Sequence, residues 1–130
     1  RLRLVRLSGR RGLALVGDGL GRGDVRDRPP HDHGRSWVIY AVQQGESEMG
    51  TYARVEDEAG KTRLVKRNAT LVKPGQAQVY LPGDIHDTLC VSGPALLFRF
   101  TERDLKKEDV VDKRVTRYAQ RDGIWVPNTP

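Results

Sequence analysis

Cysteine is almost absent from this sequence, in which Cys90 has no second cysteine to pair with. A lone cysteine cannot form a disulfide within the chain, which excludes a small secreted scaffold held by disulfides. Apolar residues never form a run of the roughly 18 residues that span a bilayer, so no membrane segment is predicted. We therefore expect a cytoplasmic protein.

Aromatic residues are also scarce, at 6% of the chain, although the composition is basic. There are 23 Lys and Arg against 17 Asp and Glu, which gives a formal net charge of +6. A nucleic-acid surface needs basic residues gathered on one face, with aromatics that stack on bases. The basic residues here are spread through alternating segments, so we expect no nucleic-acid partner. The positive charge favours encounters with small anionic ligands.

Alternation of apolar and polar residues with a period of two is the dominant pattern. It predicts short strands separated by clusters of Gly, Pro, Asp and Asn. The expected strands cover residues 1–7, 13–16, 36–43, 48–56, 62–66, 69–72, 78–81, 87–91 and 95–101. About nine short strands favour an all-β sandwich or barrel, here in a single domain over residues 1–130.

Two other segments differ from this pattern. Residues 17–30 contain four alternating glycines and end in two prolines, which predicts a loop immediately before a histidine pair. Residues 102–109 are highly charged and can form a helical turn or remain an exposed loop. Beyond them, residues 114–119 and 124–126 flank an Asp-Gly pair, a strong signal for a β-hairpin.

The three histidines of the chain lie in two turn-bounded segments. In an extended chain, residues two apart point to the same face, so His31 and His33 can present both imidazoles to one point. His86 follows a Pro-Gly turn that can aim a third imidazole in the same direction. Together these residues predict a site for one divalent transition metal.

The histidine pair and the residues after it resemble the first motif of the cupin superfamily. In that motif two histidines, one residue apart, are followed by a glutamate and then a glycine. His31, His33 and Gly45 match this pattern, whereas Val38 stands where the family has its glutamate. The carboxylate ligand of the usual cupin is therefore missing.

The segment before the third histidine is similar to the second cupin motif. Gly75, Pro82 and His86 approximate it, although Pro82 and Gly83 are adjacent rather than separated. The resemblance spans residues 30 to 101, and it implies the cupin double-stranded β-helix, a jelly-roll barrel. It also implies that the three histidines hold the metal inside this barrel.

Three histidines without a carboxylate are similar to the ligand set of three-histidine cupins, and in particular to cysteine dioxygenase-like thiol dioxygenases. This resemblance implies Fe(II) as cofactor and dioxygen as co-substrate; zinc, nickel or manganese are alternative metals. Those enzymes carry a Ser, a His and a Tyr on a late strand, where this chain offers Leu96, Phe98 and Phe100. A substrate other than cysteine is therefore expected.

Other site residues follow from the resemblance and from strand parity. The family holds the substrate carboxylate with an arginine from an early strand, and Arg3 or Arg6 lies in that region. Tyr40 is a candidate phenol beside the metal, and Cys90 is a candidate thiol because it shares strand parity with His86. The alternative interpretations are exposed arginines, a packed tyrosine and a buried cysteine.

Asp32 and Asp87 each neighbour a histidine in the sequence. A carboxylate can orient a ligating imidazole by accepting a hydrogen bond from it. Strand alternation, however, points both side chains away from the neighbouring histidine. We therefore expect both aspartates on the surface.

The leading functional hypothesis is an Fe(II)-dependent dioxygenase that acts on a small anionic substrate, for which a thiol-bearing compound is one candidate. A non-oxidative metal-dependent isomerase or hydrolase is the second hypothesis, and a non-catalytic small-molecule-binding barrel is the third. A homodimer formed through sheet edges is also expected, with no membrane partner.

Overall fold

A computed structural model describes residues 3–5, 14–19, 28–91 and 95–128 of the 130-residue chain. Within these residues, strands predominate and one short helical segment interrupts them. The first strands are β1 (Arg3–Val5), β2 (Ala14–Gly19), β3 (Arg28–His31), β4 (Val38–Gln44), β5 (Ser47–Glu56) and β6 (Thr62–Val72). They are followed by β7 (Ala77–Tyr80), β8 (Ile85–Cys90), β9 (Ala95–Thr101), helix η1 (Lys107–Val111), β10 (Tyr118–Arg121) and β11 (Ile124–Pro127).

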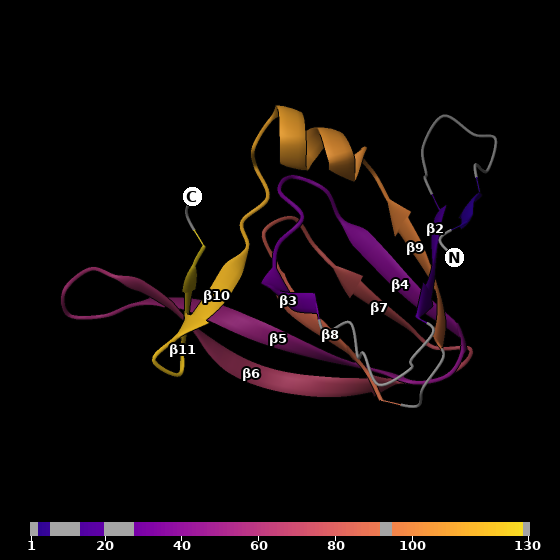
Figure 1. The fold of residues 1–130 in the computed structure, drawn as a ribbon, viewed down its shortest axis with the longest axis horizontal. Coiled ribbons are helices and arrows are strands. Elements are labelled where there is room, and N and C mark those ends of the chain that lie inside the picture. Colours follow the sequence, from indigo (N-terminus) through magenta and orange to yellow (C-terminus); the bar gives the residue numbers. More distant parts are fainter. Residues whose placement is uncertain (1–2, 6–13, 20–27, 92–94, 129–130) are drawn as a thin grey trace.

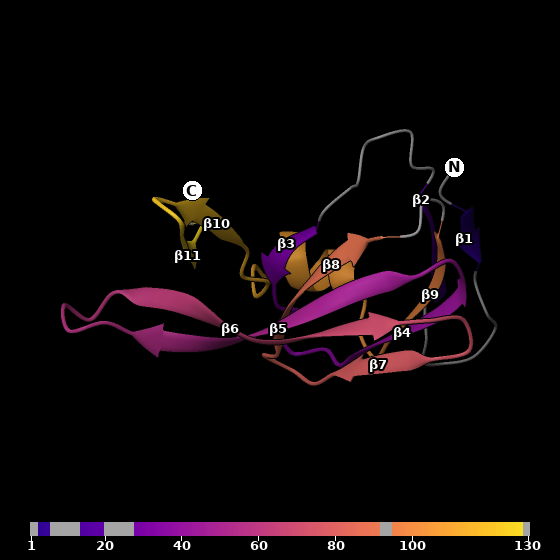
Figure 2. The same ribbon diagram turned by 90° about the horizontal axis from the view of Figure 1, so that it is seen from below.

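The strands form two antiparallel sheets that face each other (Figure 1). One sheet has the order β1-β2-β9-β4-β7, and the other has the order β10-β11-β6-β5-β8-β3. The β5–β6 hairpin is long and projects from the body of the barrel in both views (Figures 1 and 2). The predicted all-β double-stranded β-helix is confirmed by this arrangement.

The hydrophobic core of the described residues consists of two clusters, of which the first joins the two sheets and the second is formed by strands of the six-stranded sheet alone. The first contains Val42, Met49, Val72 and Tyr80. The second contains Tyr52, Leu64, Ile85 and Tyr118, with Trp125 packed against it. Because neighbouring residues of a strand point to opposite faces, alternation along these strands supplies the apolar side chains of both clusters.

Strand β3 is the main departure from the expected elements, since residues 17–30 were predicted as a loop. Residues 17–19 belong to β2, and Arg28–His31 form β3, which pairs with β8. β3 is an edge strand, where a proline without an N–H group interrupts no ladder on its open side. Pro29 and Pro30 are therefore compatible with a strand here.

Strand β6 is continuous, whereas the sequence predicted two strands over residues 62–66 and 69–72. Thr51 pairs with Asn68 and Tyr52 pairs with Lys66, so Arg67 has no partner in the register. This extra residue is a β-bulge, which absorbs the break in alternation without ending the strand.

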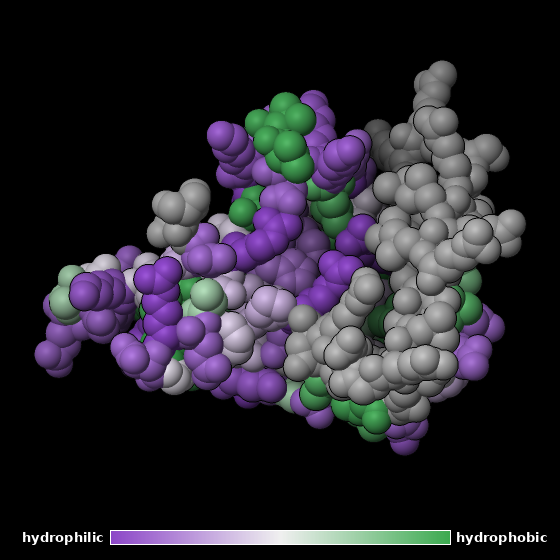
Figure 3. All heavy atoms as spheres, viewed as in Figure 1, coloured by the Kyte–Doolittle hydropathy of each residue, from purple (hydrophilic) through white to green (hydrophobic). Residues whose placement is uncertain are grey.

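The C-terminal segment contains the expected kinds of element with shifted bounds. Helix η1 begins in the charged stretch and extends two residues beyond it, and β10 and β11 form a hairpin around Asp122 and Gly123 in which β10 begins at Tyr118 rather than at residue 114. Both turn residues have positive φ, at 50° and 77°, which suits the Asp-Gly pair. Figure 3 shows an apolar patch over η1, where Val110 and Val111 are exposed. No helix among the described residues is long and apolar enough to cross a membrane.

Candidate metal centre

The three histidines are brought together by two neighbouring strands and the turn after one of them. His31 is the last residue of β3 and lies opposite His86 of β8 in the register. His33 follows in a turn in which Gly34 has a φ of 61°. A Cβ atom at position 34 would lie 2.7 Å from Oε2 of Glu108, so glycine suits this turn for both reasons.

The imidazole nitrogens of the triad converge on one point. One ring nitrogen from each histidine lies within 4.8 Å of the others. The Nε2 atoms of His33 and His86 are 3.4 Å apart. Two nitrogens bound to one tetrahedral metal at about 2.1 Å would be separated by roughly the same distance. His33 and His86 are buried, and His31 is partly buried.

Hydrogen bonding fixes the orientation of His31. Its Nδ1 atom lies 2.9 Å from the carbonyl oxygen of Pro29, and a carbonyl only accepts, so Nδ1–H is the donor. The Nε2 atom therefore keeps its lone pair, which is the state that a metal ligand requires.

All three imidazoles are poor bases in this site. Burial lowers the pKa of His33 to about 3, and the charges of His31 and Arg99 act in the same direction. Burial lowers the pKa of His86 to about 2, again with a contribution from the other two histidines. The pKa of His31 is also lowered, mainly by burial. At neutral pH the triad thus presents uncharged rings, as metal binding needs.

The donor set fits a divalent transition metal. The Nδ1 atom of His33 is buried without a hydrogen-bond partner among the described residues, and its Nε2 atom faces that of His86. Neutral imidazoles suit iron, zinc, nickel and copper better than calcium or magnesium, which prefer oxygen ligands. His31, His33 and His86 can therefore hold such an ion.

Two tyrosines border the triad. The Tyr40 hydroxyl lies 3.1 Å from Nε2 of His33. Burial raises the pKa of Tyr40, although the nearby charge of Arg99 opposes this effect. Tyr80 stacks on His86, with ring centroids 4.1 Å apart and planes 19° from parallel. Tyr40 thus keeps its proton at neutral pH, and Tyr80 fixes the plane of the His86 ring.

The prediction that Asp32 lies on the surface is wrong. Asp32 is buried and accepts hydrogen bonds from the backbone N–H groups of Gly34 and Thr116, at 3.1 and 2.9 Å. It also forms an ion pair of 3.7 Å with Arg54. The strand ends at His31, so alternation no longer applies one residue later. Asp32 instead anchors the turn that carries His33.

Asp87 is not a free surface residue either. It accepts hydrogen bonds from the N–H group of Gly50 at 2.7 Å and from the Tyr52 hydroxyl at 2.5 Å. These contacts tie β8 to β5 at the residue after His86. Asp87 therefore holds the strand that carries this histidine.

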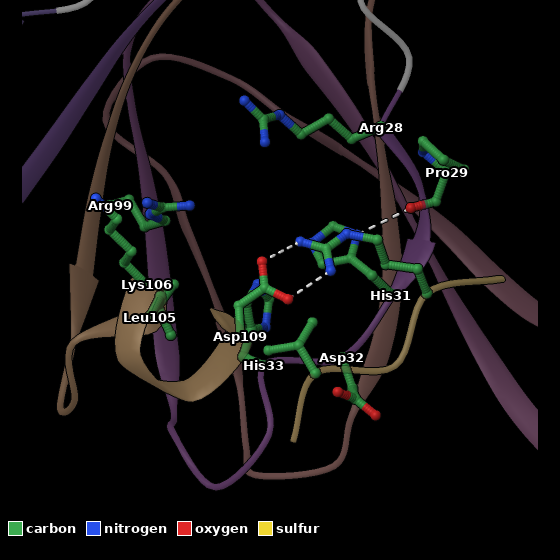
Figure 4. Close-up of a pocket in the computed structure, with 11 residues that line it drawn as sticks. Arg28, Pro29, His31, Asp32, His33, Arg99, Leu105, Lys106 and Asp109 are labelled. Carbon is green, nitrogen blue, oxygen red and sulfur yellow. Dashed lines mark hydrogen bonds and ion pairs between the residues drawn. The ribbon is translucent and has the colours of Figure 1, made fainter. Parts of the chain in front are cut away.

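A pocket of about 340 Å³ opens against the histidines (Figure 4). His31 and His33 lie in its wall together with the cationic side chains Arg28, Arg99, Lys106 and Arg117. Arg28 comes from β3 and Arg99 from β9, so the two sheets each contribute one guanidinium. The pocket combines two of the three candidate metal ligands with positive charge.

Sequence reasoning missed Arg99 because it assigned the wrong face of β9 to the interior. Leu97 packs against the core and Arg99 lines the pocket, so the inward residues are not Leu96, Phe98 and Phe100. A single charged residue within an otherwise apolar strand was the available signal. Such a residue is buried at a cost unless a partner or ligand compensates it.

The remaining site predictions are not placed by the structure. Arg6 lies outside the described residues, and Arg3 belongs to β1 without a described side-chain position. Cys90 ends β8, and the position of its thiol is likewise not described. The arginines that the structure does place at the pocket are Arg28 and Arg99.

No protein-family model matches the chain, and no curated protein matches its sequence. Solved structures resemble it in fold. The cupin domain of Schizosaccharomyces pombe Cnp3 has a TM-score of 0.57 at 10% identity, over 85% of this chain and 69% of that one. Protein NMB1881 from Neisseria meningitidis has a TM-score of 0.54 at 13% identity, over 79% and 84% of the two chains.

A third similar structure is an uncharacterized conserved protein with a double-stranded β-helix domain from Klebsiella pneumoniae. Its TM-score is 0.53 at 16% identity, over 76% of this chain and 68% of that chain. At these identities the likeness concerns the fold. The chain thus has the cupin fold, a double-stranded β-helix, and three histidines within it that can bind a metal ion.

Proposed function

We propose that this protein is a metal-dependent cupin enzyme, with Fe(II) as the first candidate metal, that oxidises a small anionic substrate with dioxygen. The observation that carries the proposal is the position of the triad, of which His31 and His33 line a pocket with several cationic side chains. A three-histidine set leaves coordination positions open for reactants. The positive charge of the pocket favours an anion.

Each residue of the site has a defined task in this proposal. His31, His33 and His86 would hold the metal, and a bound iron would supply the redox chemistry. Tyr40, protonated and 3.1 Å from Nε2 of His33, can donate its proton in a hydrogen bond to a group beside the metal. Tyr80 and the Nδ1–H group of His31 keep two of the rings in place.

A non-oxidative function is the second candidate, and the pocket face of β9 favours it. Among the described residues, Arg99 is the residue of β9 that lines the pocket, so this strand presents neither a hydroxyl nor an imidazole to it. The same three histidines suit zinc, nickel or manganese acting as a Lewis acid. In that case the pocket would hold an anionic substrate for isomerisation or hydrolysis.

The test is the metal content of protein purified without oxygen or chelator. Parent protein is compared with His86→Gln, with His31→Gln and with Gln44→Ala, an exposed control on β4. His31 is partly exposed, so its variant retains the fold where a change at the buried His86 disturbs it. Circular dichroism and gel filtration check folding of all four proteins.

Near-stoichiometric iron in the parent and the control, and its loss in both histidine variants, supports the proposed centre. Oxygen consumption is then screened with small thiol carboxylates and with carboxylates that lack a thiol. Iron without oxygen consumption, or zinc or nickel in place of iron, favours the Lewis-acid function. Parent protein that takes up no metal even after reconstitution overturns both enzymatic functions.

A further inference from the structure

We infer that the substrate is a small dianion, such as a dicarboxylate, whose two charged ends are held by Arg28 and Arg99. This inference rests on the proposed function, because it specifies the ligand of the same pocket. It starts from the position of the two guanidinium groups, which extend into the cavity from different walls (Figure 4).

Arg99 is the stronger of the two observations. Its Nε atom is buried and has no hydrogen-bond partner among the described residues. The rest of the partly buried guanidinium contacts Tyr40 through a side-chain hydrogen bond. A buried donor without an acceptor is costly, and an anion placed against Nε would satisfy it. The planar fork of an arginine can bind a carboxylate through two parallel hydrogen bonds.

The acidic side chains of the pocket are already engaged elsewhere. Asp109 forms two hydrogen bonds of 2.6 Å with Arg117, which lower the pKa of Asp109. Asp32 accepts two backbone N–H groups and pairs with Arg54. Among the described residues, no carboxylate therefore forms an ion pair with Arg28 or Arg99.

Charge and size together define the ligand. Arg28 and Arg99 contribute two positive charges without a carboxylate partner among the described residues, and a divalent metal held by neutral histidines would add to them. A monoanion would leave one guanidinium unpaired, whereas a dianion can meet both. A pocket of about 340 Å³ is at the small end of ligand sites, so the two charges belong to one compact molecule.

The experiment compares propionate with malonate, which have the same number of carbon atoms and differ in charge. Their affinities are measured by isothermal titration calorimetry for the metal-loaded and the metal-free protein. The variants are Arg99→Gln and Arg28→Gln, and the control is Arg63→Gln, which removes the same charge from an exposed position on β6. Metal content is determined for every sample.

We expect the parent and the Arg63→Gln control to bind malonate at least about tenfold more tightly than propionate, since each charge-assisted pair contributes about that factor. Each pocket variant should lose most of this preference while its metal content stays at the parental level. Equal affinities for the two anions in the parent, or an unchanged preference in both pocket variants, overturns the inference. Neither result contradicts the proposed metal centre, which the metal content of each sample tests separately.

The failure of the proposed function has a different signature. Parent protein that takes up no metal contradicts the proposed metal centre. The titrations of metal-free protein still measure anion binding by the two arginines. A malonate preference that persists there and disappears in Arg99→Gln supports a dianion site independent of metal. The loss of all anion binding in metal-free protein, with the preference restored by metal, shows that the metal and the arginines hold the ligand jointly, as inferred.

Discussion

The buried histidines make the stability of the metal-free protein sensitive to mild acid. The pKa values of His33 and His86, about 3 and about 2 in the folded state, lie below the ordinary value of 6.5 that applies in the unfolded chain. Below pH 6.5 the unfolded chain therefore binds more protons than the folded one. The stability that these neutral rings contribute is complete above pH 6.5 and falls as the pH decreases.

We therefore expect metal-free protein to lose about 1 to 2 kcal/mol of unfolding free energy per histidine between pH 7.5 and pH 5.5. Urea denaturation at several pH values in this window measures the loss, because most carboxylates titrate only at lower pH. The His86→Gln variant should show a shallower dependence, since it carries one titrating ring fewer. An equal dependence in the variant and the parent would contradict this assignment.

Asp32 is the residue on which the turn that carries His33 depends. Replacing it with alanine leaves two partly buried N–H groups, those of Gly34 and Thr116, without an acceptor. We expect Asp32→Ala to lower the free energy of unfolding by about 2 to 4 kcal/mol. Asp57 provides a matched control because it also accepts two backbone N–H groups, but in an exposed turn.

Water can replace the lost bonds at Asp57, so Asp57→Ala should lower the unfolding free energy by about 1 kcal/mol or less. Urea unfolding of the two variants under one condition gives the comparison. Similar losses in both would mean that the turn does not depend on buried hydrogen bonds of Asp32.

The spacing of His31 and His33 predicts that their side chains converge, but the backbone geometry that this prediction assumed differs from the observed one. An extended chain puts residues two apart on one face, whereas here β3 ends at His31 and a turn delivers His33. That turn depends on Glu108 and Thr116, which lie far away in sequence. Local periodicity therefore identified the ligand candidates and gave the wrong environment for Asp32.

At the scale of elements, the segment around η1 is fixed to the barrel by one buried carboxylate. Glu108 is buried, accepts a hydrogen bond from the backbone N–H of Arg35 at 3.1 Å and pairs with Arg114 at 3.3 Å. This contact joins η1 to the turn after His33. The same segment supplies Leu105, Lys106 and Asp109 to the pocket wall.

Replacing Glu108 with alanine should loosen this segment and lower the free energy of unfolding by about 1 to 3 kcal/mol, because it leaves the partly buried N–H group of Arg35 without an acceptor and removes the carboxylate that pairs with Arg114. Glu102→Ala, at an exposed position just before the segment, is the control and should change stability by less than about 0.5 kcal/mol. Limited proteolysis should show new cleavage near residues 104–114 in the Glu108 variant alone. Protection equal to that of the control would argue against this anchoring role.

Strands that the local sequence pattern defines were predicted more accurately than strands that depend on their place in the sheet. Strand β9 has the predicted bounds, 95–101, because its turns and its apolar run define it locally. Strand β3 was missed because prolines disfavour strands in general, and only its edge position permits them. The inward face of β9 depends on its partners β2 and β4, and no local pattern in a largely apolar strand specifies it.

At the scale of the whole molecule, the candidate site exists only when both sheets are assembled. The sheet that contains β3 and β8 carries His31 and His86, and the opposite sheet contributes Tyr40 from β4 and Arg99 from β9. Metal binding to this site is therefore coupled to the folding of the barrel, since the unfolded chain does not preform it.

We accordingly expect added metal to stabilise the whole molecule rather than one segment. Free metal at 100 times its dissociation constant would add about 2.7 kcal/mol, which corresponds to a rise in Tm on the order of 10 °C for a chain of this size. Differential scanning calorimetry with Mn²⁺, Ni²⁺, Zn²⁺ and, without oxygen, Fe²⁺ measures the shift and ranks the metals. The His31→Gln variant should show little or no rise, and a chelator should reverse the rise in the parent. If this variant gained as much as the parent, the stabilising ion would be bound outside the triad, because the His31 imidazole is one of the three converging ligands.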